Sequence, residues 1–284
     1  MNKNLLLLLT LGILIACNSK SKPAKADSAK TITSSDPLQQ LRRKFKPFIT
    51  GSWVKRSYID SLAKTRSPYS SKGELGGVAA LSAGVPDTGG STHIGYSMNN
   101  HEGADFILYL KPGLKSNTLK TNLTDYSGKG DFYELGYNVK NSDTALVLYH
   151  YNRNKHITDS AQYTKVTALN KDDAASGIEH ITNQTLISGL YTLSEPGKVT
   201  RVRFYDDGKI TGLSNFKTYY VNTDFEADLE SNPDEVIFDL QTKQQKSFAF
   251  KFDKDTLNIF DTKPGADLEN LIVDKLKYKL IKQR

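Results

Sequence analysis

From Pro47 onward the chain is dominated by short runs in which apolar and polar residues alternate, separated by residues typical of turns. Phe248, Phe250 and Phe252 are separated from one another by single residues, as one buried face of a strand requires. Asn99–Gly103 and Asp206–Gly208 have the composition of turns between paired strands. The pattern predicts strands at Ser52–Lys55, Thr92–Met98, Asp105–Leu110, Asp131–Val139, Ala145–Tyr151, Tyr163–Ala168, Thr200–Tyr205, Lys209–Leu213, Phe216–Asn222, Glu235–Leu240, Lys246–Phe252, Thr256–Phe260 and Lys275–Ile281. Many short antiparallel strands predict a mainly β protein, a barrel or a sandwich.

Two short helices interrupt this pattern. Asp36-Pro37 begins the first, because Asp caps a helix, Pro is favoured at its first position and apolar residues follow at helical spacing up to Phe45. Its other face is basic, which fits either a helix on a membrane surface or a helix that caps a barrel, and we favour the cap. Tyr58–Arg66 is the second predicted helix, and Ser67-Pro68 ends it.

The glycine-rich stretch Gly73–Gly95 allows two interpretations of equal weight. It holds seven of the chain's 20 glycines. One interpretation is a mobile portal loop at the mouth of a barrel, since loops at such positions carry binding functions. The other is a strand of small residues at Val78–Val85 between flexible turns.

An internal repeat divides the chain after the first helix. Phe48–Trp53 and Leu186–Tyr191 share the order apolar, Ile, hydroxyl, Gly, any residue, aromatic. Near the far end of each unit, Asp143–Leu148 parallels Asp255–Phe260, and a closing strand follows. The predicted organisation is a first β-domain at residues 36–169, a linker at 170–185 and a second β-domain at 186–284.

The Gly-x-Trp at Gly51–Trp53, preceded by a short helix, resembles the opening of the lipocalins, and Gly189–Tyr191 is a looser second copy with Tyr in place of Trp. The resemblance implies two antiparallel lipocalin-like β-barrels or half-barrels with short helices. In that family the Trp packs at the closed end of an eight-stranded barrel, and the open mouth takes a small apolar ligand. Gly51, Trp53, Gly189 and Tyr191 would then be the residues that start the barrels.

The N-terminus carries a targeting pattern. An apolar run from Leu5 to Ala16 is too short to span a membrane but has the size of a signal-peptide core. It ends in Leu14-Ile15-Ala16-Cys17, which resembles the lipobox of bacterial lipoproteins. The resemblance implies a signal peptide at residues 1–16, acyl chains such as palmitate on Cys17, and a polar tether at 17–35. Because Asn18 is not the Asp of an inner-membrane retention signal, we expect anchoring in the outer membrane, facing the periplasm.

Composition and motifs limit the kinds of partner, metal site and reaction that we expect of the chain. The chain has 38 Lys and Arg against 31 Asp and Glu, a net charge of +7 that is spread along the sequence and does not indicate a nucleic-acid partner. A single Cys excludes intrachain disulfides and thiolate-rich metal sites. Motifs of serine hydrolases, zinc proteases, phosphate loops and dinucleotide folds are absent from the sequence. We therefore expect a binding protein without a cofactor, not an enzyme.

The candidate ligand-binding residues are tyrosines, which combine an apolar ring with a polar hydroxyl. They are Tyr58, Tyr69, Tyr133, Tyr137 and Tyr219. The expected function is binding of a small apolar or amphiphilic molecule through a barrel. One alternative is an accessory envelope lipoprotein that holds a protein partner. A weaker alternative is a metal-assisted hydrolase that uses His150, His156 and Asp159, with surface histidines at a hairpin as the simpler explanation.

Overall fold

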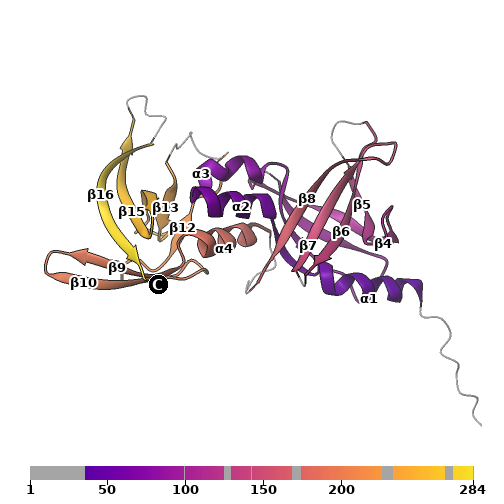
Figure 1. The fold of residues 1–284 in the computed structure, drawn as a ribbon, viewed down its shortest axis with the longest axis horizontal. Helices are drawn as coiled ribbons and strands as arrows, with labels where there is room; N and C mark the ends of the chain where they lie inside the picture. Colours follow the sequence, from indigo (N-terminus) through magenta and orange to yellow (C-terminus); the bar gives the residue numbers. More distant parts are fainter. Residues whose placement is uncertain are drawn as a thin grey trace, which may run out of the picture. The chain divides into compact units, whose positions relative to one another are not determined.

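The computed structural model describes residues 36–98, 100–124, 129–141, 143–167, 174–225, 233–265 and 271–283. The predicted signal peptide, the tether and Cys17 lie outside these residues. Asp36–Arg284 forms one compact unit by its internal contacts. Two eight-stranded antiparallel sheets dominate it (Figure 1), which confirms the predicted mainly β fold.

The first sheet is a closed barrel in which the strands pair in chain order and β1 also pairs with β8. Its strands are β1 Gly51–Lys55, β2 Val78–Ala83, β3 Ser91–Met98, β4 Glu102–Pro112, β5 Thr118–Thr124, β6 Phe132–Lys140, β7 Asp143–Tyr151 and β8 Ile157–Val166. Side chains from alternate positions fill the interior, including Trp53, Ile94, Leu108, Leu135 and Tyr163. This up-and-down order with β1–β8 closure is that of a lipocalin-like barrel.

The second sheet has the order β11-β10-β9-β16-β15-β14-β13-β12. A single bridge between Lys209 and Thr218, with a 2.7 Å hydrogen bond from the Tyr219 amide to the Gly208 carbonyl, brings its two end strands together. Its strands are β9 Gly189–Glu195, β10 Lys198–Phe204, β11 Ile210–Thr211, β12 Tyr219–Val221, β13 Glu235–Phe238, β14 Lys246–Asp253, β15 Thr256–Pro264 and β16 Leu271–Lys282. The three alternating phenylalanines of β14 pack against the core, as their spacing predicts.

Of the two interpretations of Gly73–Gly95, the strand is confirmed and the portal loop is wrong. Val78–Ala83 forms β2, which pairs with both β1 and β3. Strand β5 was not predicted, because Leu119 and Leu123 are its only large apolar residues.

Short helices connect and cover the sheets. They are α1 Pro37–Ile49, α2 Arg56–Thr65, α3 Pro68–Ser71, the 3₁₀ helix η1 Lys72–Leu75 and α4 Ala174–Leu186. Asp36 caps α1 by accepting a 3.0 Å hydrogen bond from the Leu38 amide, and Ser67, predicted as a helix stop, caps α3. Among the described helices, none is long and apolar enough to cross a membrane.

Helix α4 occupies most of the stretch predicted as a linker. One buried cluster contains Ile178 and Ile181 of α4, residues such as Val54 and Val166 from the outside of the barrel, and the interior side chains of the second sheet. Gly177 allows α4 to pack closely on β1, since a Cβ at this position would lie 3.3 Å from Val54 Cγ2. The Tyr58 hydroxyl forms a 2.9 Å hydrogen bond with Thr182 Oγ1 in the same cluster. The two sheets therefore share a hydrophobic core that is centred on α4.

The internal repeat recurs in three dimensions. Gly51 begins β1 at φ +136° and Gly189 begins β9 at φ +147°. Trp53 Nε1 donates to the Ile49 carbonyl and the Tyr191 hydroxyl to the Ile187 carbonyl, both at 2.8 Å. A lysine of the closing strand lies 5.7 Å from each ring centroid, Lys165 over Trp53 and Lys282 over Tyr191. Each sheet thus starts with the same arrangement of Gly, aromatic ring and lysine.

We expect Gly189→Ala to destabilise the protein by about 1–3 kcal/mol, because a side chain is strained at this φ and its Cβ would lie 2.7 Å from Lys282 Cε. Urea unfolding followed by circular dichroism measures the loss. Gly51→Ala should behave alike, whereas Gly73→Ala meets no atom within 4 Å and is the control. If Gly189→Ala and Gly73→Ala lower the free energy of unfolding equally, the strain argument is wrong.

Candidate functional site

Helix α1 closes one end of the first barrel. Phe45 and Ile49 are buried in the same cluster as the barrel interior, and the helix contacts β4, β6 and β7 at the lower end of the barrel in Figure 1. The interpretation of this helix as a barrel cap is therefore supported over a helix on a membrane surface.

The basic face of α1 binds the rim of the barrel. Arg42 donates to the carbonyls of Pro86 and Gly89, and Lys46 forms a 2.6 Å ion pair with Asp87. The hydrogen bond from Lys46 lowers the pKa of the Asp87 carboxyl. These cations hold the β2–β3 connection against the helix, so they explain why the sequence carries a basic face here.

The opposite end, which we call the distal end, is where β1, β3, β5 and β7 finish and the even-numbered strands begin. Interior-facing residues there are only half-buried, in contrast to the fully buried side chains in the middle of the barrel. They are Val78, Met98, Leu123, Tyr133 and Ala161. Because eight strands leave an interior just wide enough for side chains, this end is where apolar side chains of the barrel interior reach the surface.

Three polar side chains flank this apolar surface. The Tyr133 and His150 rings, which are register partners on β6 and β7, stack with centroids 4.3 Å apart at an interplanar angle of 6°. His150 Nε2 lies 3.8 Å from Asp131 Oδ2, and both side chains are less than one-fifth exposed. The distal end thus combines an aromatic face with titratable groups that are largely withdrawn from solvent.

A cleft of about 400 Å³ opens beside these residues and contains Asp131. Its other lining residues are Lys129, Asn152, Arg153 and Asn154. The Asn152 side chain accepts 3.0 Å hydrogen bonds from the amides of Asn154 and His156, which orders the β7–β8 turn. Within the described ranges neither Lys129 nor Arg153 forms an ion pair. Two cations therefore face one carboxylate in this cleft, a surplus of one positive charge.

The residues of the metal-dependent alternative do not assemble. His150 and Asp159 are cross-strand partners on β7 and β8, but His156 is exposed in the turn between them. In the part of the chain that the structure describes, no three His, Cys, Asp or Glu side chains are close enough to hold a metal ion. The predicted grouping of His150, His156 and Asp159 as metal ligands is therefore wrong.

The five candidate tyrosines lie in different places. Tyr58 and Tyr219 are buried in the shared core, and burial raises the pKa of both hydroxyls. Tyr69 lies on α3 against Phe225, and Tyr137 stacks on Phe48 of α1 with ring centroids 4.4 Å apart. Only Tyr133 lies at the distal end of the barrel. The cleft residues Lys129 and Arg153 were missed because they come from separate connections, although the turn that carries Arg153 is readable in the sequence.

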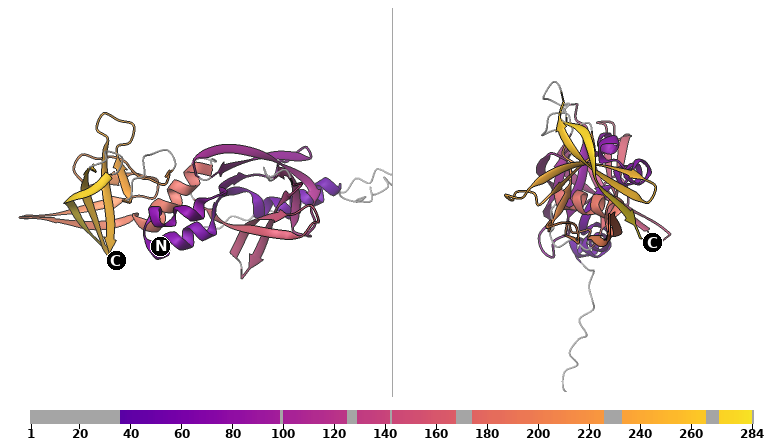
Figure 2. Two further views of the ribbon diagram at one scale, coloured as in Figure 1. Left: turned by 90° about the horizontal axis from the view of Figure 1, so that it is seen from above. Right: turned by 90° about the vertical axis from the view of Figure 1, so that its left-hand side faces the viewer.

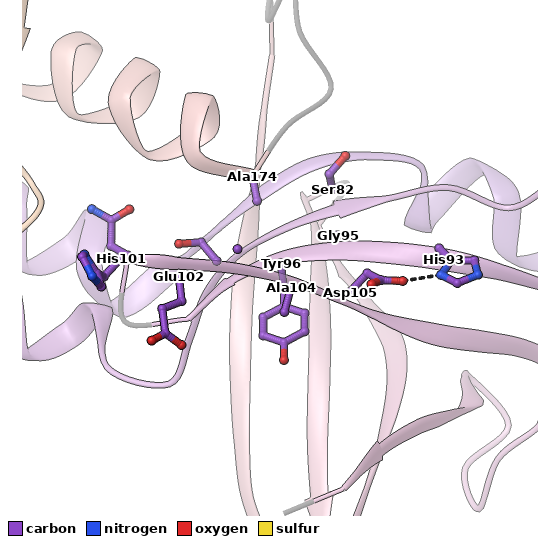
Figure 3. A pocket seen from close by; sticks show the side chains of 12 residues that line it. Ser82, His93, Gly95, Tyr96, His101, Glu102, Ala104, Asp105 and Ala174 are labelled. Carbon is purple, nitrogen blue, oxygen red and sulfur yellow. Dashed lines mark hydrogen bonds and ion pairs between the residues drawn. The ribbon is translucent and has the colours of Figure 1, made fainter.

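A second, larger hollow lies on the outside of the barrel, over β2, β3 and β4 (Figure 3). Its volume is about 760 Å³. Small residues such as Ser82, Gly95 and Gly103 line it, and a contact between His93 and Asp105 lies at one end. At the other end Asn100 donates to the Thr223 carbonyl at 2.8 Å. The hollow is a groove between strands and turns, and none of the candidate tyrosines lines it.

Comparisons with known proteins identified no match for the chain. No protein-family profile matches it, and neither the curated proteins nor the solved structures contain a significant match.

Proposed function

We propose that this protein is a cell-envelope lipoprotein, anchored through acyl chains on Cys17, that binds a small amphiphilic molecule at the distal end of its first barrel. It acts by binding and not by catalysis. The anchor and the outer-membrane location rest on the lipobox resemblance at residues 14–17.

The difference between the two barrel ends is the observation that carries the binding proposal. Phe45 and Ile49 of α1 fill the closed end, whereas Tyr133 and its apolar neighbours at the distal end are half-buried. Ligand sites are concave and mainly apolar with a few polar groups that orient the ligand. Tyr133 and its apolar neighbours supply such an apolar surface, and His150 and Asp131 beside it supply polar groups.

The cations of the cleft favour an amphiphile with an anionic head. Lys129 and Arg153 line the same cleft as Asp131, whose Oδ2 lies 3.8 Å from Nε2 of His150, the residue that stacks on Tyr133. The guanidinium of an arginine presents paired donors that suit a carboxylate or phosphate. An apolar tail on the half-buried ring of side chains would leave such a head at the cleft.

Titration of the full-length protein with dansyl-undecanoic acid, a fluorescent fatty acid, tests the proposal. We expect saturable binding, and we expect Tyr133→Ala to weaken it about tenfold, equivalent to about 1.4 kcal/mol. Tyr137→Ala is the matched control, because Tyr137 lies four residues further along β6 on the same face but at the α1 end. Absence of saturable binding, or equal losses in the two variants, would refute the distal site.

A second arm tests the anionic head. The double variant Lys129→Gln/Arg153→Gln should weaken binding of the acid by about fivefold to tenfold, since charge-assisted hydrogen bonds are lost. Binding of the uncharged methyl ester should not change. If the acid and the ester lose affinity equally, the cleft does not recognise the head.

A further inference from the structure

Strand β16 has an edge that lacks a partner over most of its length. β16 pairs with β15 from Leu271 to Ile281, but with β9 only through the three pairs that join Leu280–Lys282 to Tyr191–Leu193. Beyond these pairs the strands separate, and Figures 1 and 2 show the β9–β10 hairpin pointing away from β16. From Leu271 to Lys279, therefore, no other strand in the described residues pairs with the second edge of β16.

The same part of β16 exposes large apolar side chains. Ile272, Val273 and Leu276 are 43%, 49% and 52% exposed. On the hairpin that diverges from β16, Val199 of β10 is 71% exposed. Unpaired edges with apolar side chains are templates for the addition of another strand.

The charge of this strand indicates the kind of partner. Lys275, Lys277 and Lys279 occur at every second position, and Asp274, the only acid of β16, is paired with Lys263 at 2.9 Å. Lys277 lies 3.9 Å from Asp261, whereas Lys275 and Lys279 form no ion pair in the ranges described. Antiparallel pairing of two copies of β16 would place lysines near lysines, which is unfavourable. The edge thus disfavours a second copy of this chain and favours an acidic segment.

We propose that the edge of β16 from Leu271 to Lys279 binds an extended acidic segment of a partner protein, which adds to the second sheet as a further strand. Main-chain hydrogen bonds would supply affinity, while the lysines and the exposed Ile272, Val273 and Leu276 would select carboxylates and aliphatic side chains. This surface is separate from the distal end of the first barrel, so the two proposals stand or fall independently.

Fluorescence anisotropy of the full-length protein in detergent, with a labelled peptide of alternating Glu and Val, tests the proposal against a detergent blank. We expect saturable binding that is lost when alternate amides of the peptide are N-methylated, because methylation removes strand hydrogen bonds and keeps the side chains. A peptide of alternating Lys and Val should not bind. Equal binding of the methylated and unmethylated peptides would overturn strand addition.

Charge reversal on the protein gives the second readout. Lys275→Glu/Lys279→Glu should weaken the Glu–Val peptide roughly tenfold and allow the Lys–Val peptide to bind. The matched control is Lys243→Glu/Lys246→Glu, which makes the same charge change at exposed positions near the start of β14. If both double variants lose affinity equally, the attraction is not specific to this edge, and the proposal fails. It also fails if sedimentation shows a wild-type dimer that Lys275→Glu/Lys279→Glu abolishes.

Discussion

Replacing Ile178 with aspartate is expected to lower the free energy of unfolding by more than about 4 kcal/mol, because it buries an unpaired charge in a packed core. Ile178 has no exposed surface and lies in the cluster that joins the outside of the barrel to the interior of the second sheet. Since both sheets contribute side chains to this cluster, the loss should affect both. Urea unfolding of the full-length protein measures it with two probes, the fluorescence of Trp53 for the barrel and far-ultraviolet circular dichroism for all strands.

The control is Gln184→Asp, which adds the same charge at an exposed position of the same helix and should cost less than about 0.5 kcal/mol. In the wild-type protein the two probes should give coincident transitions, as expected of one cooperative unit. Two well-separated transitions, of which Ile178→Asp shifts only one, would show that the sheets are independent domains joined by a linker.

Helix α4 shows where sequence reasoning reaches its limit. Its segment, Ala174–Leu186, has only three large aliphatic residues, Ile178, Ile181 and Leu186. Polar residues such as Glu179 and Asn183 lie between them. That composition is typical of a solvated connection. The helix is nevertheless buried, because it is packed by two surfaces: the outside of the barrel and the inside of the second sheet. A pattern within one segment cannot report such a contact, since some of the residues that bury the helix, such as Val54 and Tyr58, lie more than 100 positions away.

The strands were easier to predict because their signal is local. Apolar and polar residues alternate, or apolar residues occupy both faces, in β6, β7 and β14. The predicted ranges of these strands agree closely with the observed ones. The start of β8 was missed because Ile157–Ser160 is exposed and mainly polar. Of the candidate ligand-binding tyrosines, only Tyr133 lies at the distal end. Its neighbours come from other strands and connections, and only the closure of the barrel brings them together.

The repeated barrel opening leads to the second large prediction, that Trp53→Ala costs about 3–5 kcal/mol. Trp53 is 1% exposed, packs inside the barrel beside α1 and donates a hydrogen bond to Ile49. Removing the indole leaves a cavity and an unpaired carbonyl, and it releases the end of α1 from the first strand. Circular dichroism during urea unfolding measures the loss, since the variant has no tryptophan.

Tyr191 is the equivalent residue of the second sheet, fully buried and bonded in the same way to Ile187. Tyr191→Ala should therefore cost a similar amount, whereas Tyr191→Phe keeps the ring and should lose only about 1–3 kcal/mol for the unsatisfied carbonyl. If the repeat is structural, Trp53→Ala and Tyr191→Ala lower the unfolding midpoint by comparable amounts. A loss below about 1 kcal/mol in either alanine variant would mean that its ring does not anchor the preceding helix to its sheet. The first strand of each sheet would then be held by β-pairing alone, and the shared motif would have no common role in stability.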